Sequence, residues 1–173
     1  MNSDPRTNLN QIKNDDIILL DANICLYAIR QKSTQCEQLL SRCAIGEVTG
    51  IMPCHILAEI MHQLMIAEAR DYQWIKGSNP AKQLAGLPDR VRALRRYEEL
   101  IRDILGMGLQ IEPVVHEDFI TSMEVQRQAG LLTNDALLVA VGERLRVTSI
   151  VSADQAFSRA PGIVLYSPSD LES

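Results

Sequence analysis

The sequence has few aromatic residues and no apolar run long enough to cross a membrane. Phe, Trp and Tyr make up 4% of the 173 residues, which leaves little surface on which single-stranded bases could stack. Residues 1–14 are polar and lack the apolar core of a signal peptide. No later run approaches the ~20 apolar residues that span a bilayer. The sequence therefore predicts a cytoplasmic protein that does not enter the membrane.

The cysteines lack the spacing of a zinc site or a disulfide framework. Cys25, Cys36, Cys43 and Cys54 fall in apolar segments, and no two of them form a C-x-x-C pair. This pattern favours buried free thiols in a reducing compartment.

The net charge of −5 argues against a protein that coats nucleic acid without sequence preference, because such binding relies on clustered Lys and Arg. Residues 70–102 nevertheless hold eight basic and four acidic side chains. No acidic residue lies four residues before or after Arg90, Arg92 or Arg96, so these three lack a local ion-pair partner of that kind. Contact of these three with RNA phosphates is one hypothesis, and a solvated or partner-facing helix surface is the favoured alternative.

Short apolar runs alternate with segments of helical periodicity. The runs that predict strands are 17–20, 48–52, 109–115, 149–152 and 163–166. The patterns that predict helices cover 23–29, 34–45, 53–69, 89–105, 116–129 and 133–145. This alternation predicts an α/β fold, a three-layer α/β/α sandwich around a mostly parallel four- or five-stranded sheet, in a single domain spanning 1–173.

Two acids lie just after the ends of predicted strands. Asp21 comes after the first strand and Asp154 after the fourth, and right-handed crossovers bring the carboxyl ends of parallel strands to one edge, where ligands bind. Asp135 could simply stabilise the first turn of its helix through the helix dipole, without any function. Glu59 lies at the edge of an apolar stripe, where a structural role is as plausible as a functional one. Gathered together, however, four carboxylates repel one another unless a cation shares them.

A hard divalent cation resolves that repulsion. Mg²⁺ or Mn²⁺ prefers oxygen ligands and keeps several waters, which suits hydrolysis of a phosphodiester bond. The residues alone leave open whether one or two ions bind.

Four segments resemble the successive motifs of PIN-domain nucleases. They are IILLDANICLYA, PCHILAEI, TNDALLVAVGERL and IVSADQAFSRAPGIVLYSP, and their order and spacing match the family from Asp16 to Pro168. The resemblance implies a PIN-like fold whose catalytic and metal-binding acids are Asp21, Glu59, Asp135 and Asp154. It also implies that Asn23 and Ser152 support these acids.

Among PIN domains the chain most resembles toxin ribonucleases of the VapC type. Such a resemblance implies cleavage of RNA, a homodimer, and inhibition by a cognate antitoxin whose segment blocks the acidic crevice. The sequence does not distinguish RNA from structured DNA as the substrate.

The chain departs from the family pattern at three places. Ala22 replaces a frequent Thr or Ser, Ala156 stands where many members carry another acid, and residues 70–96 form a predicted helical or irregular insertion. These departures leave open an alternative, a non-catalytic PIN-like binding or scaffold module. Retention of all four acids favours the nuclease.

Two other folds with an Asp after the first strand fit less well. A haloacid-dehalogenase phosphatase needs D-x-D where this chain has Asp21-Ala22-Asn23. A receiver domain needs a Lys near its last strand, and no Lys follows Val147.

Overall fold

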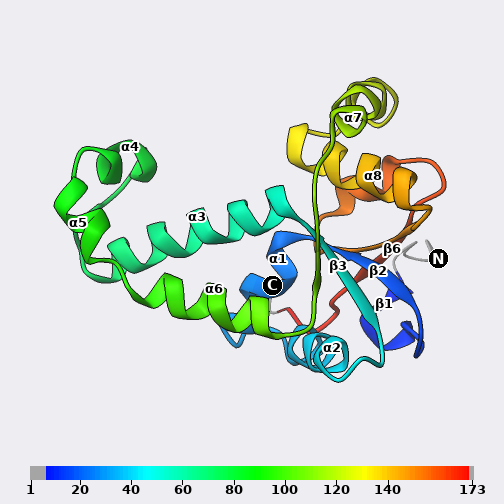
Figure 1. Ribbon diagram of the computed structural model, residues 1–173, viewed down its shortest axis with the longest axis horizontal. Helices are drawn as coiled ribbons and strands as arrows, with labels where there is room; N and C mark the ends of the chain where they lie inside the picture. The colour runs from blue at the N-terminus through cyan, green and yellow to red at the C-terminus, as the bar shows by residue number, and fades with distance from the viewer. Residues whose placement is uncertain (1–6, 172–173) are drawn as a thin grey trace.

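A six-stranded, wholly parallel sheet forms the centre of the molecule (Figure 1). The computed structural model describes residues 7–171, so residues 1–6 and 172–173 of the predicted domain lie outside it. The strands are β1 (Thr7–Asn8), β2 (Ile17–Leu20), β3 (Thr49–Pro53), β4 (Gln110–Glu112), β5 (Ser149–Val151) and β6 (Val164–Ser167). They are arranged in the order β1-β6-β5-β2-β3-β4, and every pair is parallel. All five predicted strands are present, and β1 adds a short sixth at the edge.

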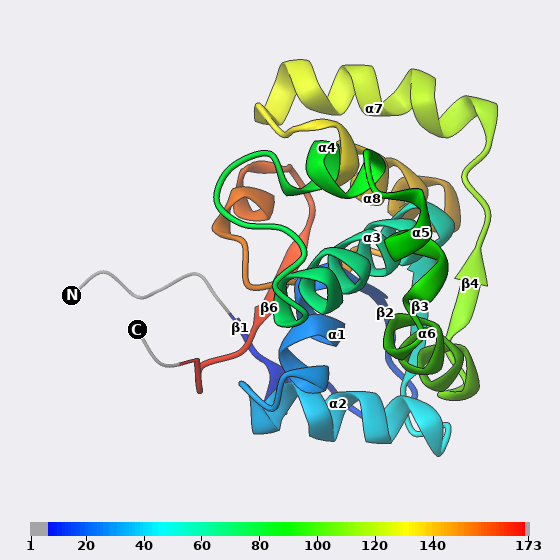
Figure 2. The ribbon, with the colours of Figure 1, turned by 90° about the vertical axis from the view of Figure 1, so that its left-hand side faces the viewer.

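Helices cover both faces of this sheet, which confirms the predicted sandwich. Figure 2 shows α1 (Ala22–Ile29) and α2 (Thr34–Ala44) on one side of the strands, with α8 (Thr133–Leu145) and then α7 (His116–Ala129) on the other. The helix α3 (Cys54–Asp71) begins at the carboxyl end of β3. None of the helices in residues 7–171 has both the length and the apolar content needed to span a bilayer.

Burial in the core explains why the sequences of β2 and α8 are almost continuously apolar. Ile18, Leu19 and Leu20 are fully buried, as expected for a parallel strand covered on both faces. Every residue of α8 from Ala136 to Gly142 is buried. A side chain at Gly142 would meet Leu19 at 2.7 Å, so this glycine permits α8 to lie directly against β2.

An arm made by α3 and α6 (Arg96–Gly106) extends away from the sheet (Figure 1), with α4 (Pro80–Ala85) and α5 (Pro88–Ala93) at its tip. A separate hydrophobic cluster of Ala69, Ile75, Leu84 and Leu94 holds the tip together. The arm includes the predicted insertion 70–96 but also uses helices on either side of it.

The prediction of one helix over 89–105 is wrong, because two non-helical residues separate α5 from α6. Leu94 has an extended backbone, and the carboxylate of Glu68 then accepts hydrogen bonds from the next three backbone N–H groups. These are the amides of Arg95 at 3.0 Å, Arg96 at 3.2 Å and Tyr97 at 2.9 Å. The Glu68 side chain thus caps a new helix that starts where periodicity alone predicted continuity.

The prediction of buried thiols holds for three of the four cysteines. Cys25 on α1 and Cys36 and Cys43 on α2 are buried, whereas Cys54 is exposed at the start of α3. All four are free. Burial raises the pKa of the Cys25 thiol to about 12 and that of Cys36 and Cys43 to about 11, so these three behave as apolar core residues.

Candidate active site

Asp21 lies where the sheet changes the direction of its connections. From β2 the chain crosses to β3 on one side, while β5, which pairs with β2 on the other side, continues to β6. Crevices at such switch points are the usual ligand sites of parallel sheets. Asp21 directly follows β2 and is the N-cap of α1, with its Oδ1 accepting the Ala22 N–H at 2.7 Å.

A buried hydrogen-bond network joins Asp21 to the loop after β5. The hydroxyl of Ser152, which is fully buried, donates to Asp21 Oδ2 at 2.5 Å. Asn23 Nδ2 donates to the same oxygen at 2.6 Å and to Ser152 Oγ at 3.0 Å. Its Oδ1 accepts the Ala153 N–H at 3.1 Å. Ser152 Oγ also accepts the Asp154 N–H at 2.9 Å, so both strand-end acids are fixed by one cluster.

Glu59 reaches the same crevice from α3 and has an amide on each of its oxygens. Gln63, one turn further along α3, donates to Oε1 at 3.0 Å, and Asn134 donates to Oε2 at 2.7 Å. The carbonyl of Asn134 lies 3.1 Å from His55 Nε2. Asn134 precedes Asp135 in the first turn of α8, so these contacts tie α3 to the start of α8.

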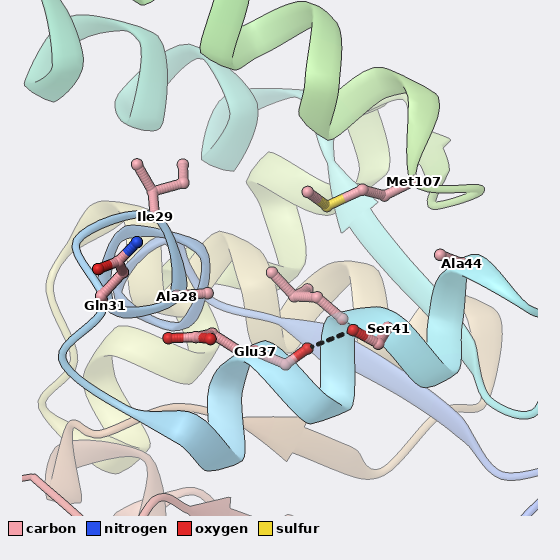
Figure 3. Close-up of a pocket in the computed structure, with 8 residues that line it drawn as sticks. Ala28, Ile29, Gln31, Glu37, Ser41, Ala44 and Met107 are labelled. Carbon is pink, nitrogen blue, oxygen red and sulfur yellow. Dashed lines mark hydrogen bonds between the residues drawn. The ribbon is translucent and has the colours of Figure 1, made fainter.

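The structure brings all four predicted acids to one pocket of about 230 Å³. Its lining residues are Asp21, Ala22, Asn23, Leu26, Tyr27, Arg30, Glu59, Gln63, Asp135 and Asp154. A different pocket, of about 320 Å³, opens between α1, α2 and the end of α6 (Figure 3), where Leu40 and Met107 give it an apolar wall. The four carboxylates identify the first of these pockets as the candidate active site.

Crowding of negative charge is visible in the pKa values of two of the acids. Burial, followed by repulsion from Asp21, Asp154 and Glu59, raises the pKa of Asp135 to about 6. Burial also raises the pKa of Asp21, although the hydrogen bonds from Ser152 and the Ala22 N–H act in the opposite direction. The pocket therefore holds carboxylates that are costly to ionise together.

The chemistry of this donor set fits a divalent cation. In residues 7–171, no three Asp, Glu, His or Cys side chains form a group that could hold a metal ion as they stand. The four acids would therefore have to draw together around an ion. Carboxylate oxygens are the ligands that Mg²⁺ and Mn²⁺ prefer, and a shared cation would relieve the repulsion at Asp135.

The three arginines predicted to bind RNA lie on the arm, where each of them contacts another side chain. Arg92 pairs with Asp89, and Arg96 pairs with Asp71. Arg90 lies over the ring of Trp74 at 4.8 Å from its centroid. No acid lies at i, i+4 spacing from any of the three, as expected. Their partners are Asp89, three residues from Arg92, and Asp71 and Trp74, which approach from the end of α3. Their contact with RNA stays a prediction.

Three residues of this site were not predicted from the sequence. Gln63 could have been found from its i, i+4 spacing to Glu59. Asn134 adjoins Asp135 in the sequence, but its amide is aimed by the packing of α8 against α3, which no local pattern reports. Arg30 ends α1 and is the one basic residue among those that line the carboxylate pocket in the described chain.

Comparison with known proteins assigns the fold to a family. A family model described as the PIN domain matches residues 18–163, which is most of the chain. The chain belongs to the PIN domain family. All four acids of this PIN domain fall within the matched segment, and PIN domains are generally nucleases. No curated protein matches the sequence.

Solved structures share the fold of this PIN domain at low sequence identity. One is VapBC2 from Rickettsia felis bound to a fragment of promoter DNA, with a TM-score of 0.55 and 20% identity over 87% of this chain and 98% of that one. Another is a toxin–antitoxin complex from Klebsiella pneumoniae, with a TM-score of 0.53 and 14% identity over 85% and 95%. A third is a Pyrobaculum aerophilum protein with a TM-score of 0.51 and 13% identity over 86% and 87%.

Proposed function

We propose that this chain is a metal-dependent endoribonuclease and the toxin of a toxin–antitoxin pair. The observation that carries the proposal is the convergence of four carboxylates, from the ends of β2 and β5 and the starts of α3 and α8, on one pocket. The raised pKa of Asp135 supports it, because strongly perturbed pKa values cluster at functional sites. The toxin assignment is supported by the fold that the chain shares with toxin–antitoxin complexes.

In this proposal the four acids hold Mg²⁺ or Mn²⁺ next to the RNA backbone. The bound ion would supply a lowered pKa for the attacking water and would stabilise charge on the phosphate. Asp21, Glu59, Asp135 and Asp154 provide the oxygen ligands. Ser152 and Asn23 hold Asp21 in place through hydrogen bonds to its Oδ2, while Gln63 and Asn134 orient both oxygens of Glu59.

The test is cleavage by the purified protein. Single-stranded and structured RNAs, with matched DNAs, are incubated with Mn²⁺, with Mg²⁺ and with a chelator. We expect cleavage of RNA that requires the metal. Asp135→Asn, which removes one charge from the pocket without changing its shape, should reduce the rate at least about 100-fold, in the range for loss of an essential group.

The matched control is Asp103→Asn, the same change at an exposed position on α6. This variant should cleave like the wild type. Equal activity in the wild type and in Asp135→Asn would identify a contaminating nuclease. Absence of both cleavage and Mn²⁺ binding by calorimetry would reject the nuclease and leave the scaffold module, while preference for DNA would reject the RNA substrate alone.

We propose two protein partners for the same chain in the cytoplasm. One is a cognate antitoxin with a segment that covers the carboxylate pocket, as supported by the toxin–antitoxin complexes that share this fold. The other is a second copy of the chain. The apolar, exposed side chains of Phe119, Ile120 and Met123 on the outer face of α7 support a homodimer.

A further inference from the structure

A second pocket adjoins the carboxylate pocket and shares Arg30 with it. This second pocket, of about 460 Å³, lies between the end of α1, the outer part of α3 and the start of α6. It is lined by Ile29, Arg30, Leu64, Ala67, Asp71, Arg96 and Leu100. Because Arg30 also lines the carboxylate pocket, its side chain stands at the junction of the two cavities.

One face of α3 runs through both pockets. Glu59 and Gln63 line the carboxylate pocket, and Ala67 and Asp71 line the second pocket. These four residues follow one another at i, i+4 spacing, so they form one row along the helix. The rise from Glu59 to Ala67 is about 12 Å. A chain bound along this row would therefore pass directly from the acids into the second cavity.

We infer that the second pocket receives a nucleobase of single-stranded RNA next to the scissile phosphate, with Arg30 binding the phosphate between them. This inference rests on the proposed ribonuclease function and adds a specificity site to it. The pocket has the volume and mixed lining of small-molecule sites, with apolar walls and a few polar groups that fix orientation.

The charge at the junction favours an anionic backbone there. Arg30 is exposed, and within residues 7–171 no carboxylate forms an ion pair with it. A guanidinium beside four carboxylates lowers the cost of bringing a phosphate to them. Leu64, Ala67 and Leu100 provide apolar contact for the flat face of a base. The Asp71–Arg96 ion pair, which also lines this pocket, offers both an acceptor and donors to the edge of the base.

The experiment uses the full-length protein and a pool of short random single-stranded RNAs, with cleavage sites read by sequencing. Ala67→Phe fills the second pocket without touching the acids. We expect the base preference at one position beside the cut to be lost, and kcat/KM to fall about tenfold, which is within the range for loss of an apolar contact in a specificity pocket. The control Ala44→Phe makes the same change on α2 in the pocket of Figure 3. It should leave the base preference and kcat/KM unchanged.

A binding measurement keeps this inference separate from the nuclease proposal. Labelled RNA is titrated with Asp135→Asn protein in Mn²⁺, with and without Arg30→Ala, over a series of salt concentrations. We expect Arg30→Ala to weaken binding and to reduce the slope of log affinity against log salt by about 0.7, the loss of one phosphate contact on a single strand. Arg127→Ala on α7, which lines neither pocket, is the matched control.

The outcomes separate the two proposals. If the wild type cleaves RNA and Ala67→Phe keeps the same sites and kcat/KM, the base pocket is refuted and the nuclease stands. If no RNA is cleaved, the nuclease proposal fails, and the salt slope decides whether Arg30 holds a phosphate. An unchanged slope with Arg30→Ala overturns the inference in either case. Thermal unfolding of each variant shows that the fold is intact.

Discussion

Ser152 connects the two strand-end acids although it carries no charge. Its hydroxyl donates to Asp21 and accepts from the Asp154 amide, and burial prevents water from replacing either bond. The hydrogen bond to Asp21 opposes the rise in pKa that burial imposes on that carboxyl. Ser152 therefore acts on the pocket through Asp21, as residues behind metal ligands commonly do.

We predict that Ser152→Ala weakens Mn²⁺ binding by about 10–100-fold, the usual effect of losing a hydrogen bond to a metal ligand. The reason is that Asp21 would lose a donor that favours its ionised form. Calorimetric titration measures the change. Ser167→Ala is the control, because Ser167 is also buried and donates to the Ser152 carbonyl but does not touch Asp21. A similar loss of affinity in both variants would assign the effect to packing.

Which residues meet in the pocket was partly predictable. Asp21 and Asp154 follow strands, and position after a strand determines at which edge of a parallel sheet a residue lies. Glu59 and Asp135 lie on helices, and their positions depended on the resemblance to a family. The amide partners of Glu59 and the junction position of Arg30 depend on how α1, α3 and α8 approach one another, which no local pattern contains.

At the scale of elements, the helix α6 exists because of a side chain on a different helix. Glu68 is 1% exposed, and its carboxylate satisfies three N–H groups that a helix start would otherwise leave without partners. Burial alone would raise its pKa, but the hydrogen bonds from the Arg95, Tyr97 and Arg96 amides bring it below the usual value. The folded protein thus favours the ionised form of Glu68.

We predict that Glu68→Gln lowers the free energy of unfolding by about 2 kcal/mol at neutral pH, because it removes a charged helix cap. The lowered pKa sets the sign of the pH dependence. The contribution is full above the ordinary glutamate pKa of 4.5 and is lost as the pH falls through the lowered pKa of the folded state. Urea unfolding of both proteins at neutral and acid pH should therefore show a difference that shrinks in acid.

Glu99→Gln provides the comparison for this prediction. Glu99 lies in the first turn of α6 and is exposed, so solvent weakens the interaction of its charge with the helix dipole. Its substitution should cost a few tenths of a kcal/mol. Equal losses in both variants would contradict the capping role of Glu68.

The elements with regular patterns were predictable, and the exceptions have physical reasons. The apolar stretches of β2 and α8 were found because burial on all sides requires them. The α5–α6 break was missed because its cause lies across 27 residues of sequence. The strand β1 has two residues, too few to show a period, and is held in place by pairing with β6.

At the scale of the whole molecule, α7 is apolar on two sides. Its inner stripe includes Val125 and Ala129, which are buried against the core, while Phe119, Ile120 and Met123 are 48–54% exposed on the outside. A helix that packs on one side only has a polar outer face. The exposed apolar patch is therefore expected to be covered by another protein surface.

We predict a dimer that Phe119→Glu combined with Met123→Glu converts to a monomer. Burying two charges in an apolar contact costs more than the contact gains. Light scattering after gel filtration gives the mass, and the Tm of the wild type, unlike that of the variant, should rise with protein concentration. Gln128→Glu introduces the same side chain at an exposed position of α7 off the row of Phe119 and Met123, and should stay dimeric. A wild-type monomer at all concentrations would refute the homodimer.

The order of the strands was not predictable from their patterns, and it determines when the pocket can exist. β2 pairs with β5, although 128 residues separate the end of the first from the start of the second. Of the four acids, the last comes from residue 154. During synthesis, a ribosome must therefore have passed residue 152 before Asp21 gains its neighbour Ser152. A nascent chain that ends before Asp154 lacks the pocket, so the four acids can act together only in chains that have grown past this residue.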